Sequence, residues 1–174
     1  MKILRDLRAV AGTSPFKMIR SIFFGYSFAV VFWYRVAHFF YKMRLWPISV
    51  IIMFFHKLIF SVDVDYRCEI GGGVLIIHGL GLVIGKDVTL EENVTLYQGV
   101  TLGGNNGKSK VVQGRERTQP YICAGAKIYT GACIFGPCEI GKNSVIGARA
   151  VITSDVPANT CVYTKSERVE IPIK

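Results

Sequence analysis

The residue best suited to acid–base chemistry in the C-terminal two thirds of this 174-residue chain is His78. It is the only histidine in residues 61–174, so it is the one side chain there whose ordinary pKa lies near neutrality. A neutral imidazole can take the proton of a hydroxyl group while the hydroxyl oxygen attacks an activated carbonyl carbon. His78 is therefore the candidate general base, and a purely structural role stays open on this observation alone.

A six-residue period surrounds this histidine. The recurring aliphatic residues are Ile70, Ile76, Leu82, Val88, Val94 and Val100, and then Ile122, Ile128, Ile134, Ile140, Ile146 and Ile152. A period of two would indicate a strand and 3.6 an amphipathic helix. A period of six predicts short strands joined by corners, with one aliphatic side chain per repeat directed into a common core.

Small residues and glycines accompany the period. In the second run a small residue stands two places before most of the aliphatic ones: Ala126, Ala132, Cys138, Ser144 and Ala150. Four glycines follow an aliphatic residue, where we expect them to supply bends with unusual φ: Gly71, Gly85, Gly141 and Gly147. The sequence predicts a mainly β protein, a parallel β-helix over residues 61–174 after an α-helical segment over residues 1–60.

Residues 1–60 are expected to form two helices. Ser14 and Pro15 are typical of a helix start, and the first helix is expected to run to about Met43. Pro47 begins a second helix that ends near Phe60. One helix face should carry Arg35, His38 and Lys42, which are spaced three and seven residues apart.

The charge of the chain is concentrated in this helical segment. Nine Lys and Arg against one Asp leave +8 in residues 1–60, whereas residues 61–174 carry +1. Basic residues that punctuate an apolar, aromatic stretch favour contact with an anionic membrane surface over nucleic-acid binding. A helical subdomain that only packs on the rest is the alternative.

The apolar runs are too short to span a bilayer, and no signal-peptide pattern is present. We expect a cytoplasmic protein, peripheral on the inner face of a bacterial plasma membrane.

The five cysteines fit a reducing compartment. Their number is odd, and they include no CxxC pair and no histidine at ligand spacing. We interpret them as small hydrophobic residues and expect neither a disulfide nor a zinc site.

Three stretches resemble the hexapeptide-repeat acyltransferases, and more narrowly the serine acetyltransferase group. They are VDVD at residues 62–65, IHGLGLVIG at 77–85 and VTLYQGVTLGG at 94–104, within a match over residues 62–156. The resemblance implies a left-handed parallel β-helix, a homotrimer, and acetyl-CoA as co-substrate without a metal. The short basic lead-in, with YRVAHF at residues 34–39, is more similar to bacterial polysaccharide acetyltransferases of the colanic-acid type.

Carried over residue by residue, the resemblance assigns His78 as catalytic base and Asp63 as the carboxylate that orients it. Backbone N–H groups are expected to bind the thioester oxygen as it becomes an oxyanion. We place the cofactor beside Gly103, Gly104, Lys165 and Arg168, the last two from their charge alone.

The acceptor is expected to be a saccharide hydroxyl, for two reasons. Gln119, before Pro120, stands where serine acetyltransferases have a histidine that contacts the amino acid, and the basic lead-in points to a membrane-linked glycan. The loop over residues 103–119 interrupts the hexads by four residues and adds Arg117 as a second candidate substrate ligand.

Three other functions compete with this hypothesis. Serine O-acetylation in cysteine biosynthesis is the alternative acetyl transfer. A zinc hydratase of the γ-carbonic anhydrase type needs three histidines, and the predicted β-helix has one. A non-catalytic scaffold explains the period but not Asp63 and His78 at the family's spacing.

Overall fold

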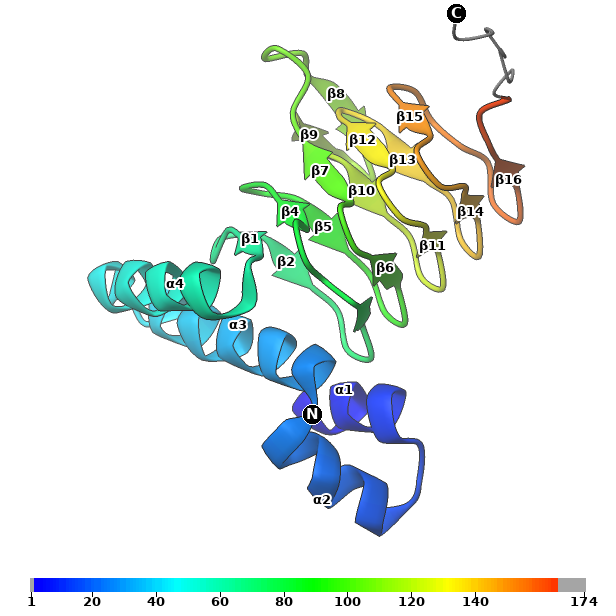
Figure 1. Cartoon of the computed structure of the whole chain (residues 1–174). Helices are drawn as coiled ribbons and strands as arrows, with labels where there is room; N and C mark the ends of the chain where they lie inside the picture. Colours follow the sequence, from blue (N-terminus) through cyan, green and yellow to red (C-terminus); the bar gives the residue numbers. More distant parts are fainter. Residues whose placement is uncertain (1, 166–174) are drawn as a thin grey trace, which may run out of the picture.

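The computed structural model describes residues 2–165 and consists of four helices followed by a parallel β-solenoid (Figure 1). The helices are α1 (Lys2–Ala11), α2 (Pro15–Phe24), α3 (Tyr26–Lys42) and α4 (Trp46–Phe60). The strands of the first coils are β1 (Asp63–Val64), β2 (Glu69–Ile70), β3 (Leu75–Ile77), β4 (Val83–Ile84), β5 (Thr89–Leu90), β6 (Thr95–Tyr97) and β7 (Thr101–Gly103). They are followed by β8 (Lys110–Val112), β9 (Arg115–Arg117), β10 (Tyr121–Ile122), β11 (Lys127–Ile128), β12 (Cys133–Phe135), β13 (Glu139–Ile140), β14 (Val145–Ile146), β15 (Val151–Ile152) and β16 (Cys161–Val162).

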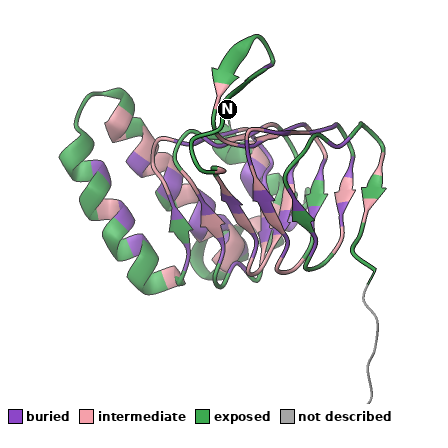
Figure 2. Ribbon diagram, turned by 90° about the horizontal axis from the view of Figure 1, so that it is seen from above, coloured by how far each residue is buried: buried purple, intermediate pink, exposed green. Residues whose placement is uncertain are grey.

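Three parallel sheets form the three faces of the solenoid. Sheet A has the order β1-β4-β7-β12-β15, sheet B the order β13-β10-β5-β2, and sheet C the order β16-β14-β11-β6-β3. In each sheet the aliphatic residues lie in register, so that Leu96, Ile128 and Ile146, for example, stack along sheet C. Figure 2 shows the buried residues lining the inside of the coil. The expected parallel β-helix with an N-terminal helical segment is confirmed.

The six-residue period is confirmed, but the single phase assigned to its first run is wrong. A regular coil spans 18 residues, as between Ile84 and Leu102. The coil that contains His78 spans 20, since Ile76 lies opposite Leu96. Two extra residues at His78 therefore shift the phase of every later repeat. From there the strand positions are 84, 90, 96 and 102, whereas Leu82, Val88, Val94 and Val100 occupy the buried position two places earlier.

The excursion after β7 is larger than the sequence suggests. Leu90 pairs with Ile122, 32 residues later, against 18 for Ile122 and Ile140. The insertion is therefore 14 residues and not four. Most of it forms the antiparallel hairpin β8–β9.

The four repeat glycines have a different role from the one expected, because none of them adopts a positive φ. They are needed where neighbouring coils approach closely: a Cβ added at Gly71 would lie 2.5 Å from the carbonyl carbon of Glu91, and one at Gly141 would lie 2.4 Å from the Ala158 nitrogen. The left-handed corners are formed instead by other glycines, such as Gly99, and by residues such as Asn93.

The first expected helix is broken in two. Pro15 begins α2 as predicted, but Gly25 is extended and α3 turns away by 67°. Gly25 permits this break because a Cβ there would lie 2.4 Å from the Ser21 carbonyl oxygen. Helix α4 begins beside Pro47 and ends at Phe60.

Helix α3 covers the open end of the solenoid, where β1, β2 and β3 are edge strands. Its Tyr34 hydroxyl donates to the Cys68 carbonyl at 2.6 Å, and Arg35 donates to the Gly71 carbonyl at 2.6 Å. His38 Nδ1 lies 2.8 Å from the Tyr66 carbonyl oxygen, and Lys42 pairs with Glu69. The expectation that Arg35, His38 and Lys42 share a helix face is confirmed.

Candidate active site

The two extra residues place His78 at the corner between sheets C and A. His78 follows β3 and adopts a left-handed φ of +53°, a conformation that histidine tolerates better than most residues. The Gly81 N–H donates to the Ser61 carbonyl at 2.9 Å and fastens the loop to the coil edge. The imidazole is exposed, and it lines a hollow of about 480 Å³.

Asp63 lies at the same corner. It opens β1 directly beside Val83, and its N–H donates to the Leu82 carbonyl at 2.8 Å. Within residues 2–165 the recorded partner of its carboxylate is Lys57, at 2.5 Å, and not His78. The structure thus brings Asp63 and His78 to one corner, and their direct hydrogen bond stays a prediction.

Three further residues at this corner were not found from the sequence. Tyr26 and Ser27, at the start of α3, line the hollow beside His78. The Tyr26 hydroxyl donates to the Phe60 carbonyl at 2.8 Å, and the Ser27 hydroxyl accepts from the Ile76 N–H at 3.2 Å. Gln98 lies one coil further along, and its buried Oε1 has no hydrogen-bond partner in the described part of the chain. An unpartnered buried amide oxygen is the signal that marks Gln98, and only the structure reveals it.

A second group of predicted residues gathers at the next corner, between sheets A and B. Gln119 packs against Gly104, where an added Cβ would lie 2.8 Å from Gln119 Nε2, and beside Gly85. Gln119 Oε1 is also buried without a partner among residues 2–165. Gly103 and Gly104, at the end of β7, therefore lie in the same corner as Gln119.

Arg117 is held at this second corner by contacts of its guanidinium group. Its Nη1 donates to Thr89 Oγ1 at 2.8 Å, and its guanidinium carbon lies 4.7 Å from the centre of the Tyr121 ring. Burial, and then a hydrogen bond to Glu91, raise the pKa of Tyr121 to about 12, so the phenol stays a donor at neutral pH. A hollow of about 340 Å³ is lined by Arg117, Gln119 and their neighbours.

The two corners are separate in one chain. The His78 corner joins sheets C and A, and the Gln119 corner joins sheets A and B. Lys165 follows β16 at the far end of the solenoid and is exposed. Arg168 lies outside the described residues. Over residues 2–165 the structure has no group of three or more His, Cys, Asp or Glu side chains that could hold a metal ion.

A parallel solenoid of hexads with a histidine on an inserted loop defines a hexapeptide-repeat protein. No protein-family model matches the chain. A serine acetyltransferase of Bacillus pumilus is 38% identical over 138 residues, which are 79% of this chain and 61% of that protein. One of Helicobacter pylori is 34% identical over 137 residues, 78% of this chain and 77% of that protein. The chain belongs to the serine acetyltransferase family.

A comparison with solved structures supports the same family. The crystal structure of the Brucella abortus serine acetyltransferase in complex with coenzyme A has a TM-score of 0.83 and 28% identity, and the match covers 96% of this chain and 65% of that one. The chain spans about three fifths of the length of the Bacillus pumilus protein.

These comparisons overturn the expected saccharide acceptor and do not support the narrower resemblance to colanic-acid-type enzymes. The relatives that match most of the chain are named serine acetyltransferases. A glutamine still offers both a hydrogen-bond donor and an acceptor, so Gln119 in place of histidine does not exclude an amino acid. Tyr34, Arg35 and His38, which carried the narrower resemblance, bind carbonyl groups of the first coil and so report how α3 packs.

Proposed function

We propose that this protein is a serine O-acetyltransferase, which transfers the acetyl group of acetyl-CoA to the serine hydroxyl. The observation that carries the proposal is the family, found over more than three quarters of the chain. The candidate base supports it, because the inserted loop holds an exposed imidazole above a hollow that is open to a small substrate.

The proposed reaction uses His78 as general base. Its imidazole takes the serine hydroxyl proton while the oxygen attacks the thioester carbonyl carbon. The tetrahedral intermediate then collapses, the C–S bond breaks, and the coenzyme A thiolate leaves and takes up a proton. Asp63 would stabilise the imidazolium from the same corner once its carboxylate turns from Lys57. Gly103 and Gly104 would border the coenzyme, with Lys165 near its phosphates.

The test is a thiol-release assay with acetyl-CoA and serine. We expect His78→Asn to lower kcat/KM by about 10²–10⁴-fold, the usual contribution of a general base. Asparagine tolerates the left-handed backbone at this position, so the loop should keep its shape. His38→Asn is the matched control and should retain activity, because His38 hydrogen-bonds Tyr66 near the C-terminal end of α3, whereas the hollow beside His78 is lined by the N-terminal end of that helix. A folded wild-type protein that leaves serine unmodified would contradict the proposal.

We also propose that the working unit is a homotrimer whose site combines the two corners from neighbouring chains. The separation of the two corners within one chain supports a shared site, because a substrate that touches both His78 and Gln119 needs a second subunit. The number of three subunits comes from the resemblance to the hexapeptide-repeat acyltransferases.

Mixing two inactive variants tests the shared site. His78→Asn and Gln119→Ala are each expected to be inactive alone. Random mixed trimers should recover about one quarter of the sites, because each productive corner pair needs one chain of each kind in the right order. If both residues of a site came from one chain, every chain would carry one defect and mixing would restore nothing.

A further inference from the structure

Helix α4 buries polar side chains and exposes large apolar ones, the opposite of a helix whose outer side faces water. Its buried residues include Ser49, whose hydroxyl donates to the Ala37 carbonyl at 2.7 Å, and His56, whose Nε2 lies 3.1 Å from the Val30 carbonyl oxygen. Apart from Lys57, which pairs with Asp63, its remaining surface is apolar and open. The exposed large apolar residues are Trp46, Ile48, Val50, Ile51, Phe54, Phe55, Leu58 and Ile59. A helix that is apolar on its outer side normally lies against protein or lipid.

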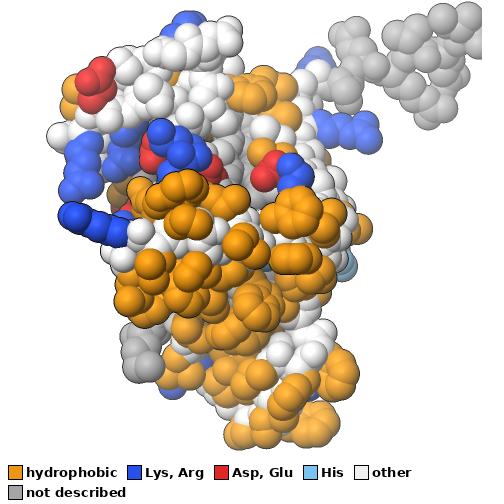
Figure 3. Space-filling model, turned by 90° about the vertical axis from the view of Figure 1, so that its left-hand side faces the viewer, with side chains coloured by type: hydrophobic (Ala, Val, Ile, Leu, Met, Phe, Trp, Pro, Cys, Tyr) orange, Lys and Arg blue, Asp and Glu red, His pale blue; other side chains and the backbone are white. Residues whose placement is uncertain are grey.

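The same surface continues over the two preceding helices, as Figure 3 shows. From α3 and its C-terminal turn it includes Trp33, Phe39, Met43 and Leu45, and from α2 it includes Phe16, Ile19, Ile22, Phe23 and Phe24. We call these residues, with those of α4, the outer helical face. A surface of this extent exceeds what a protein normally exposes to water, so it marks a binding surface.

The exposed charges on the helices of this face are all positive, and the nearby carboxylates of Asp63 and Glu69 are paired with Lys57 and Lys42. The only acidic residue before residue 61 is Asp6, which is buried and paired with Arg35. Lys17 and Arg20 on α2, and Arg44 between α3 and α4, form no ion pair in the part of the chain that the structure describes. An apolar surface with unpaired cations and no exposed carboxylate matches the interface of an anionic bilayer.

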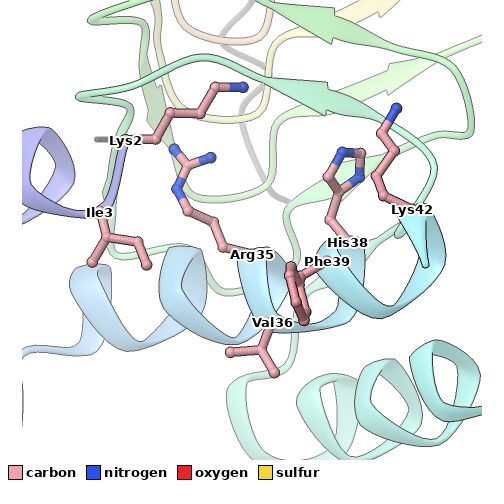
Figure 4. A pocket seen from close by; sticks show the side chains of 7 residues that line it. All are labelled: Lys2, Ile3, Arg35, Val36, His38, Phe39 and Lys42. Atoms are coloured by element: carbon pink, nitrogen blue, oxygen red, sulfur yellow. The ribbon is translucent and has the colours of Figure 1, made fainter. Parts of the chain in front are cut away.

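A groove of about 520 Å³ at the edge of this face also combines basic and apolar side chains, although its Arg35 and Lys42 are paired with Asp6 and Glu69 (Figure 4). Its basic side chains point toward the solenoid, and its apolar ones point away from it. The basic residues are Lys2, Arg35, His38 and Lys42, and the apolar ones are Ile3, Val36 and Phe39.

The face is suited to lie on a bilayer and not to cross it. No single helix among residues 2–165 is long and apolar enough to span a membrane, and only the bent pair α2 and α3 passes by length and composition. Helix α3 is hydrogen-bonded to the first coil through Tyr34, Arg35 and His38, which ties it to the solenoid.

We propose that the outer helical face docks on the interfacial region of a bilayer that contains anionic lipids, such as the cytoplasmic leaflet of a plasma membrane. A second copy of the chain is a poorer occupant. A two-fold interface would bring Lys17, Arg20 and Arg44 of both copies together with no exposed carboxylate on the helices to compensate them.

Vesicle flotation with the full chain tests the proposal. We expect recovery with vesicles of phosphatidylglycerol and phosphatidylcholine in roughly equal parts, and much less with phosphatidylcholine alone. Replacing Lys17, Arg20 and Arg44 by Gln should weaken binding about fivefold per charge removed at low salt.

A second variant tests the apolar part. Phe54→Gln with Leu58→Gln changes side chains that are 60% and 63% exposed, so folding should persist while flotation falls. Val111→Gln with Val151→Gln, at 68% and 63% exposure on the solenoid, is the matched control and should float like the wild type. Circular dichroism and gel filtration confirm the fold of each variant.

Two outcomes overturn the proposal. One is a wild-type protein that does not float with anionic vesicles. If light scattering then shows that the Phe54 and Leu58 variant has a smaller oligomer than the wild type, a second copy of the chain is the occupant of the face. The other is flotation that survives both sets of substitutions on the outer helical face. Neither readout involves acetyl transfer, so the result is independent of the proposed function.

Discussion

The buried ion pair between Asp6 of α1 and Arg35 of α3 joins two helices, and both side chains also hydrogen-bond the first coil of the solenoid, so removing one charge should be strongly destabilising. The Asp6 carboxylate accepts from Arg35 Nε at 2.5 Å, from Arg35 Nη2 at 2.9 Å and from the Gly73 N–H at 2.8 Å. The two side chains are only 2% and 10% exposed. Asp6→Asn keeps the shape of the side chain and removes its charge, so the Arg35 guanidinium is left without a counter-ion.

The expected cost follows from this burial. Breaking a buried pair by removing one charge costs about 3–5 kcal/mol. Arg35 also donates to the Ile70 carbonyl at 3.1 Å and to the Gly71 carbonyl at 2.6 Å, and these contacts partly replace the lost carboxylate. We therefore expect Asp6→Asn to lower the free energy of unfolding by about 3 kcal/mol, the lower end of that range.

The assay is urea unfolding at one protein concentration, for Asp6→Asn, Arg35→Met and the double variant. The double variant should cost about 2 kcal/mol less than the sum of the single ones, because the two groups interact directly. Glu69→Gln is the control, since the Lys42–Glu69 pair is 56% and 49% exposed and should contribute no more than about 1 kcal/mol. A cost below about 1 kcal/mol for Asp6→Asn, or strictly additive costs, would refute the reasoning.

Two other changes test the packing. Burial lowers the pKa of His56 despite its hydrogen bond to the Val30 carbonyl, so the unfolded chain binds this proton more readily. The free energy of unfolding should therefore fall as the pH drops below about 6.5, the pKa of histidine in the unfolded chain. Urea unfolding above and below this pH should show a smaller fall for His56→Gln than for the wild type. An equal fall in both proteins would contradict this. Gly141→Ala should cost about 3 kcal/mol, because its Cβ would lie 2.4 Å from the Ala158 nitrogen. Gly107→Ala, with open space around it and a φ of +73°, should cost about 1–2 kcal/mol in the same assay. Equal free energies of unfolding for the two variants would reject the close-approach role of Gly141.

The solenoid was predictable because its period is a local property of the sequence. Every repeat directs an aliphatic side chain into the same core, so Ile122, Ile128 and Ile134 report the fold without any knowledge of their neighbours. The pairing of coils is not local. Whether a glycine serves a left-handed turn or a close approach depends on the residue one coil away, which is why the role of Gly71 was misassigned.

The helical segment was predictable in type but not in shape. Proline marks the starts of α2 and α4 because its fixed φ suits the first helical turn. The break at Gly25 could not be found from propensity, since one glycine inside an apolar helix is often tolerated. The apolar composition suggested a covered surface, but only the structure shows that Ser49 and His56 face inward while Phe54 and Leu58 face outward.

The two extra residues at His78 account both for the wrong phase assigned to the first run of hexads and for the position of the candidate site. A hexad that gains two residues can no longer stay on the solenoid surface, so the extra residues must leave the coil as a loop. The loop carries His78 and is held by the Gly81 amide on Ser61, which places the histidine outside the packed core and at the same corner as Asp63. The larger insertion after β7 does the same for Arg117 and Gln119 at the next corner. Packing of the solenoid core does not require a break in the period. Both breaks occur at the candidate catalytic and binding residues. The interruptions of the repeat are therefore better guides to the site than the repeat itself.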